Sequence, residues 1–173
     1  DTSSLALQYN HGLPRPVYWV LWLWQRLRGE VLVNDKRVLL TRHLNGYQLL
    51  LRNVVVFNPL LSSEEAFIQR FRQQYHLHLK GMRGKWRIKC HLFDQHNGAL
   101  YPLLEGVGSE SGPDEEMWRW IAHKARPTLS VRDERLYDGW QLTESLESNA
   151  LVLYEFTPLV PREAETEEIH SPR

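Results

Sequence analysis

The sequence predicts an α+β domain in which hairpins build an antiparallel sheet and two or three helices pack against it. Three observations lead to this fold class. Asn45-Gly46 separates two runs rich in β-forming residues, as in a tight hairpin. Apolar and basic residues alternate over 85–92, the period of a strand with one buried face. Segments with helix start signals follow Ser62 and Pro113, and a mixture of hairpins and helices is typical of α+β proteins.

Length and composition place bounds on the domain organisation. The chain has 173 residues, which favours one domain, and we expect an N-terminal arm over 1–14, a single domain over 15–161 and a disordered acidic tail over 162–173. The longest apolar run, 17–24, has eight residues, whereas a bilayer span needs about 20. The single cysteine, Cys90, excludes an internal disulfide framework and a zinc site built from several cysteines.

The first ordered segments are an apolar block and a meander. Residues 18–29 fit a buried helix or a buried strand, and Pro16 before them with Gly29 at their end favours a short helix. Strands are predicted over 31–33, 36–44 and 47–57. Asn45-Gly46 is expected to form the type I′ turn between the last two, with positive φ at both positions.

The remaining elements follow from capping signals and from changes of period. A helix is predicted from Ser62 to Tyr75, and a strand from Tyr75 to Lys80. A second hairpin is expected, with a strand over 85–92, a turn over 94–98 and a return strand over 99–104. The last elements are listed in chain order: a helix over 113–126, and strands over 129–137 and 150–156.

Two stretches of the sequence resemble one another. Strand-like residues ending in 57–61 precede the acidic helix start at 62–65, and 101–104 precede a similar start at 113–116. Two ββα units around one sheet would explain this pseudo-repeat. We favour the alternative, a chance similarity between common signals that end a strand and begin a helix.

Charge is unevenly distributed along a chain whose formal net charge is zero. Residues 15–92 contain 14 Lys and Arg against 4 Asp and Glu, while residues 93–173 contain 7 against 16. One interpretation is a basic face available to an acidic partner or to nucleic acid. The other is that the two halves pack together and neutralise each other.

The strand over 85–92 supplies the first candidate binding surface. Its basic side chains should project from one face at a spacing that could follow an acidic surface, and nucleic-acid binding is therefore the second functional hypothesis. The residues of this surface are Arg83, Lys85, Arg87, Lys89 and His91.

The helix over 113–126 supplies the second candidate surface. Trp120 falls outside the predicted apolar face of this helix and lies near Arg119 and His123. An exposed tryptophan beside arginine is typical of an anchor in a protein interface. The alternative is that another element covers Trp120, whereas Trp86 and Trp118 fit core faces.

Signals for catalysis and for bound cofactors are missing. The chain contains no P-loop, no dinucleotide-binding glycine pattern and no nucleophile elbow. Strand parity places Cys90 and His91 on opposite faces, which argues against a shared zinc site and for solvated histidines. Burial among apolar residues would keep the Cys90 thiol inert. We therefore predict no catalytic, metal or cofactor site, and an enzyme is the third hypothesis.

One resemblance to a known family concerns the tryptophan-rich first half. The blocks YWVLWLWQRLRGEVLVNDKRV, LTRHLNGYQLLLRNVVVFNPL and GKWRIKCHLFD resemble the C-terminal region of the foamy-virus Bet accessory protein. The resemblance implies a non-enzymatic protein of the cytoplasm and nucleus that binds and blocks host antiviral cytidine deaminases, and it assigns no residue. The leading hypothesis is accordingly a non-enzymatic protein-binding domain.

Overall fold

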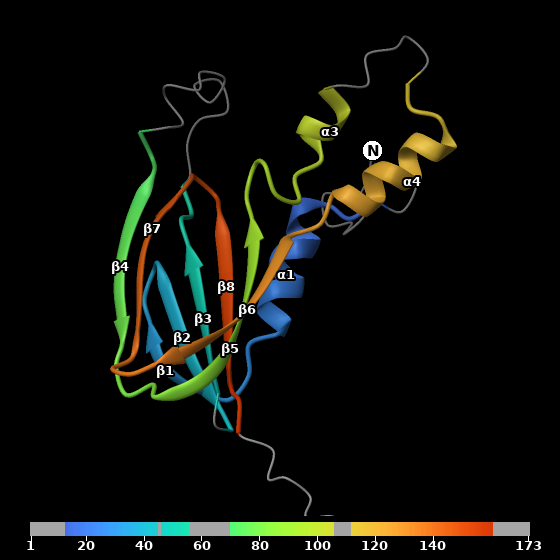
Figure 1. Cartoon of the computed structure of the whole chain (residues 1–173). Coiled ribbons are helices and arrows are strands. Elements are labelled where there is room, and N and C mark those ends of the chain that lie inside the picture. Colours follow the sequence, from blue (N-terminus) through green and yellow to red (C-terminus); the bar gives the residue numbers. More distant parts are fainter. Residues whose placement is uncertain (1–12, 45, 56–69, 106–111, 161–173) are drawn as a thin grey trace, which may run out of the picture.

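The computed structural model describes residues 13–44, 46–55, 70–105 and 112–160 (Figure 1). They form helices and mostly antiparallel strands, which confirms the α+β class. The predicted tail and nearly all of the predicted arm lie outside the described residues.

The helices and strands alternate irregularly along the chain. The helices are α1 (Pro16–Gln25), α3 (Tyr101–Glu105) and α4 (Glu115–Lys124). The strands are β1 (Glu30–Asn34), β2 (Val38–His43), β3 (Gly46–Arg52), β4 (Gln73–Leu79), β5 (Gly84–Phe93), β6 (Thr128–Leu136), β7 (Trp140–Leu146) and β8 (Leu151–Pro158).

Two sheets and one helix make three layers. The larger sheet has six strands in the order β1-β2-β3-β8-β5-β6, and the smaller sheet pairs β4 with β7. The last strand of the chain, β8, lies in the middle of the large sheet between β3 and β5. In Figure 1, β4 and β7 stand on one side of the large sheet and α1 lies on the other.

Alternation along the central strands divides the core in two. On β3, Leu49 and Leu51 face the small sheet and pack with Tyr75, whereas Leu50 faces α1. The α1 side also contains Trp19 and Leu23 of the helix with the following sheet residues: Leu39, Phe93, Leu151 and Leu153. Because both faces of the large sheet are covered, β3 and β8 read as nearly continuous apolar runs.

Most predicted strands are present. The segment over 18–29, for which the sequence allowed a helix or a strand, forms a helix that begins at Pro16. The return strand over 99–104 is wrong, because α3 occupies most of this segment. Strand β5 pairs instead with β6 and β8, which are distant in sequence. Strand β7 was not predicted, although Trp140, Leu142 and Leu146 are apolar residues at the alternate positions typical of a strand.

The hairpin between β2 and β3 is confirmed, but its register differs by one residue. His43 pairs with Gly46, so the two-residue loop is 44–45, and Leu44 adopts a positive φ of 51°. Asn45 lies outside the described residues. Gly46 is the first residue of β3, and a Cβ there would lie 2.5 Å from the carbonyl oxygen of Phe156. Close approach to β8, rather than turn geometry, therefore requires the glycine.

The two predicted capped helices have different outcomes. Residues 56–69 lie outside the described part of the chain, but Tyr75, expected at the end of the first helix, is buried in β4. The second helix is α4, which begins at Glu115 rather than at Pro113. Its N-cap is Asp114, whose carboxylate accepts a hydrogen bond from the Met117 backbone amide.

Candidate functional site

The strongest polar constellation lies where the C-terminal end of α1 meets the large sheet. Its centre is Glu155 on β8, which we group with Arg26, Gln48 and His91 as the Glu155 cluster. The Arg26 guanidinium donates to Glu155 Oε1 from Nε at 3.1 Å and from a terminal nitrogen at 2.7 Å. His91 Nε2 lies 2.9 Å from the same oxygen, and Gln48 Nε2 donates to Oε2 at 3.1 Å.

The cluster holds Glu155 in its ionised form. Burial alone would raise the pKa of Glu155, but hydrogen bonds from His91, Arg26 and Gln48 outweigh it and lower the pKa to about 2. A carboxylate with this pKa and with both oxygens bonded is a poor general acid or nucleophile. Its role in this geometry is to fix the groups around it.

Helix α1 is clamped by the same groups. The Trp22 ring lies edge-on to the His91 ring at 5.4 Å between centroids, and the Arg26 guanidinium lies 4.8 Å from the Trp22 centroid. Gln48 Nε2 also donates to the Arg26 carbonyl at 2.6 Å. The cluster therefore joins α1 to β3, β5 and β8.

A cavity of about 560 Å³ opens beside the Glu155 cluster. Its lining includes Arg26, Gln48 and Glu155 of the cluster, and also the side chains of Arg28, His43 and Tyr47. The lining carries three cationic or ionisable nitrogen groups against one carboxylate, and that carboxylate is already paired. Such a lining suits an anionic or hydroxyl-rich ligand.

Three cavities on the described residues each contain at most one carboxylate. The second, of about 550 Å³, is lined by aromatic residues of α1 with His91 and Arg126, and the third, of about 490 Å³, lies on α4 and contains Glu115. Hydrolysis of glycosides typically uses two carboxyl groups about 5–9.5 Å apart across the bond that breaks. The described cavities do not offer that pair.

The predicted basic strand is present only in part. The side chains at its start are exposed, as expected: Arg83, Lys85, Arg87 and Lys89. Arg87 forms a bidentate pair with Asp133 of the neighbouring β6, with nitrogen–oxygen distances of 2.8 and 3.1 Å. That pairing lowers the positive charge the strand presents to solvent.

His91 lies on the predicted face of the strand, but the expectation that it is exposed there is wrong. It is 4% exposed, because α1 covers the end of β5 and leaves both faces of the strand buried there. The periodicity of β5 signals which residues share a face, but it carries no information about a helix packed across one end of that face.

The candidate anchor on α4 is exposed. Trp120 is 50% exposed, and Arg119 forms an i,i+4 pair with Glu115 at 2.9 Å. His123 lies exposed in the last turn of the helix. Trp118, expected in the core, is only half-buried, whereas Trp86 is buried as predicted. Whether Trp120, Arg119 and His123 bind a partner remains a prediction.

The sole cysteine, Cys90, is partly buried and packs against the core on the side that parity suggested. Burial raises the pKa of the Cys90 thiol, and the neighbouring Tyr154 hydroxyl donates a 2.6 Å hydrogen bond to Glu144. A protonated thiol in this setting has little nucleophilic character.

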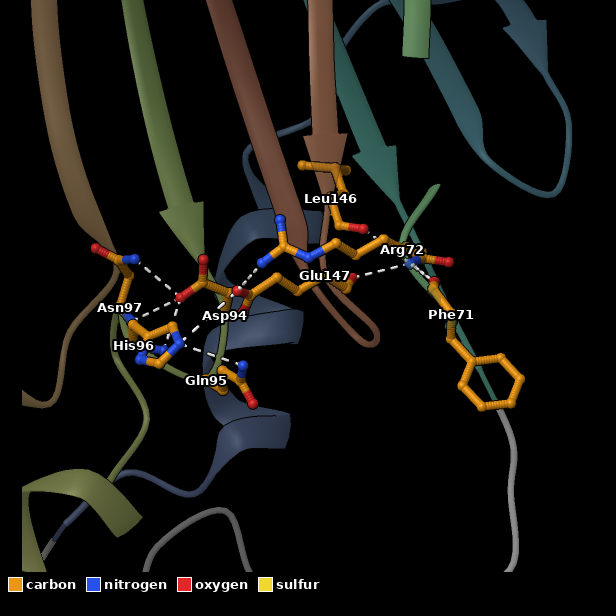
Figure 2. A network of polar contacts seen from close by, with 9 residues as sticks. Phe71, Arg72, Asp94, Gln95, His96, Asn97, Leu146 and Glu147 are labelled. Atoms are coloured by element: carbon orange, nitrogen blue, oxygen red, sulfur yellow. Dashed lines mark hydrogen bonds and ion pairs between the residues drawn. The ribbon is translucent and has the colours of Figure 1, made fainter. Parts of the chain in front are cut away.

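A second polar network ties the strand ends together (Figure 2). Glu147 accepts from Arg72 at 2.8 Å and lies 3.7 Å from His96 Nε2, while Asp94 accepts backbone amides of the turn that follows β5. Asn53 Nδ2 lies within 3.1 Å of three backbone carbonyl oxygens in the same region. These contacts link connections between strands, which is a structural role.

The described residues contain neither a candidate metal-binding group nor a helix that could span a membrane. No group of three or more His, Cys, Asp or Glu side chains in this part of the chain could hold a metal ion. Over the same residues, no helix has the length and apolar character needed to cross a membrane.

The amino-acid sequence is similar to bacterial regulators. No protein-family model matches it. Uncharacterized HTH-type transcriptional regulators of Staphylococcus aureus, including those of strains COL and N315, are 27% identical over 154 residues, 88% of this chain. The chain spans about a fifth of their length, since the match covers 21% of each regulator.

The fold is that of part of the GH39 enzymes. The GH39 enzyme from Xanthomonas axonopodis pv. citri matches with a TM-score of 0.72 and 13% identity, over 89% of this chain and 32% of its own. A monomeric β-xylosidase from Caulobacter crescentus matches with a TM-score of 0.68 and 14% identity, over 90% and 33%. A bacterial orthologue of human α-L-iduronidase matches with a TM-score of 0.66 and 18% identity, over 86% and 28%.

These comparisons correct the functional expectations. The expected viral accessory factor that antagonises host cytidine deaminases is wrong, since the matches are bacterial regulators and glycosidases. The expectation of a non-enzymatic protein is also overturned, because enzymes contain this fold. The resemblance to foamy-virus Bet gains no support from the comparisons.

Proposed function

We propose that this chain is the β-sandwich module of a longer bacterial transcriptional regulator that handles a sugar through a glycosidase-like part. The observation that carries the proposal is the match of 88% of the chain to a fifth of HTH-type regulators. The fold supports it independently, because the same layers occur within about a third of each GH39 chain. A regulator that combines these parts would couple a sugar to DNA binding.

The described residues indicate a division of labour within that longer protein. A helix-turn-helix motif needs two adjacent helices joined by a short turn, and α3 has only five residues. The three cavities described above lack paired carboxylates. We therefore assign DNA contact and any sugar chemistry to other parts of the longer protein, and assign this module a supporting role beside the sugar-handling part.

Two finer expectations belong to the same proposal. A DNA-binding regulator acts in the cytoplasm, where a lone thiol such as Cys90 stays reduced. The ββα pseudo-repeat stays a proposal for its first unit only, whose predicted helix falls on residues 56–69, outside the described part of the chain. Its second unit lacks the expected return strand, because α3 occupies most of 99–104.

The test compares the longest natural reading frame that contains these 173 residues with the isolated 173-residue chain. Both are titrated by calorimetry with xylobiose and with iduronate, the classes of sugar suggested by the neighbouring xylosidases and iduronidase. Binding to upstream DNA is measured by fluorescence anisotropy across a salt series. We expect the longer protein to bind one sugar, and its DNA affinity to change at least threefold when that sugar is present.

Two results would contradict the proposal. One is tight, strongly salt-dependent binding of DNA by the isolated chain, which would make this module the DNA reader. The other is a longer protein that binds neither sugar nor DNA. The rate of p-nitrophenyl xyloside hydrolysis is measured for both proteins. Hydrolysis would indicate a hydrolase, and sugar binding without hydrolysis would indicate a sensor.

A further inference from the structure

Helix α1 has an apolar face that stays largely exposed, and among the described residues the Arg52 guanidinium lies over its last member, 5.7 Å from the Trp24 ring centroid. Val17, Val20, Leu21 and Trp24 follow the i, i+3, i+4, i+7 spacing of one helical stripe. They are 45%, 36%, 41% and 47% exposed, respectively. We call these four residues the outer α1 face.

The opposite face of the same helix is already fully used. Trp19 and Leu23 are buried against the large sheet, with Tyr18 and Trp22 packed beside them. The helix contains no charged residue from Pro16 to Gln25. A helix that is apolar on all sides is typical of a layer buried between two others. Among the described residues, α1 packs on the large sheet with one face and borders a cavity with residues 122–129 on its Tyr18 and Trp22 side.

The geometry points to a docking surface: we infer that the outer α1 face packs against the adjoining part of the same longer polypeptide. The inference rests on the proposed function, because the occupant is the remainder of that protein. The chain spans 21% of its regulator relatives and about a third of the GH39 chains, so a large body of polypeptide lies outside it there.

The position of α1 makes it suitable for such a contact. It forms the outermost layer on its side of the large sheet, away from β4 and β7 (Figure 1). The Glu155 cluster fixes its C-terminal end through Arg26, so the face is presented rigidly. The occupant should offer an apolar surface, because an uncharged stripe gives charged groups no partner.

Cysteine labelling tests the inference in the protein with and without its remainder. In a Cys90→Ala background, Leu21→Cys reports on the outer α1 face. Gln141→Cys on β7 is the matched control, because it is exposed on the opposite layer. Reaction rates with a polyethylene-glycol maleimide are measured for each variant in the isolated 173-residue chain and in the longest natural reading frame that contains it.

We expect Leu21→Cys to react at least tenfold more slowly in the longer protein, and Gln141→Cys to react equally in both. Equal rates at position 21 would overturn the inference. Protection at position 21 that already appears in the isolated chain and grows with its concentration would also overturn it, by making a second copy the occupant. These rates are independent of sugar and DNA binding, so they separate the docking surface from the proposed function.

Discussion

Single residues decide how firmly α1 is held, and Glu155 is the most consequential. Glu155→Gln keeps the shape of the side chain but removes the charge that Arg26 and His91 face. We expect the variant to lose ~3 kcal/mol of unfolding free energy at pH 7, the order found when one member of a buried ion pair is removed. Urea denaturation followed by circular dichroism measures the loss.

The pH dependence gives the same residue a second test. Since the pKa of Glu155 falls from 4.5 to about 2 on folding, its stabilisation is present above about pH 5 and is lost as the pH falls toward 2. Between these limits the wild-type chain should lose roughly 3 kcal/mol more than Glu155→Gln. Glu134→Gln, which removes an exposed carboxylate, should follow the wild-type curve. Parallel curves for wild type and Glu155→Gln would show that the cluster adds no net stability.

The tryptophans of α4 differ in exposure, and their truncation should show it. Trp120→Ala is expected to cost under ~1 kcal/mol, because half of its surface already faces solvent. Trp118→Ala should cost more, about 1–3 kcal/mol, since Trp118 is half-buried. Thermal and urea unfolding of both variants measure the difference, and a reversed order would mean that Trp120 is the structural residue.

At the scale of elements, the hairpin between β2 and β3 shows why Gly46 is needed. Gly46→Ala places a methyl group 2.5 Å from the Phe156 carbonyl oxygen, so β3 and β8 must separate. We expect a loss of ~2 kcal/mol in unfolding free energy. Gly81→Ala is the control: its added Cβ meets nothing within 4 Å, and only its φ of +81° is unfavourable, for about 1 kcal/mol. Equal losses of unfolding free energy in Gly46→Ala and Gly81→Ala would show that the close approach of Gly46 to Phe156 does not require a glycine.

The same elements show which features a sequence can predict. Local signals sufficed for β2, β3, β5 and α4, because alternation, turn residues and caps act over a few positions. They failed for 99–104 and for the burial of His91, which depend on distant partners: β6, β8 and α1. The Glu155 cluster could not be predicted, because its members come from four segments that no spacing relates. The residues suggested as partner-binding could be placed by period, but not assigned an occupant.

For the whole molecule, charge asymmetry along the chain does not produce two oppositely charged bodies. The pairs Arg26–Glu155, Arg72–Glu147 and Arg87–Asp133 each join the basic first half to the acidic second half. This supports the interpretation that the halves neutralise each other, at least along these contacts. The interleaving follows from topology, since β8 enters the sheet between strands of the first half.

That topology predicts how truncation acts on the whole fold. A chain that ends at residue 149 lacks β8 and would leave β3 and β5 with unpaired edges and with both apolar clusters open. We expect this shorter chain to be unfolded, because β8 contributes contacts that no other described element replaces. Narrow dispersion of the amide proton shifts in NMR spectra would report the unfolded state. A chain that ends at Val160 keeps every described element and should give native-like dispersion. Adding a synthetic peptide of residues 150–160 to the shorter chain should restore dispersion, since the peptide can fill the vacant strand position by main-chain pairing. A shorter chain that folds without the peptide would show that β8 is dispensable, and that the order of strands in the large sheet does not determine cooperativity.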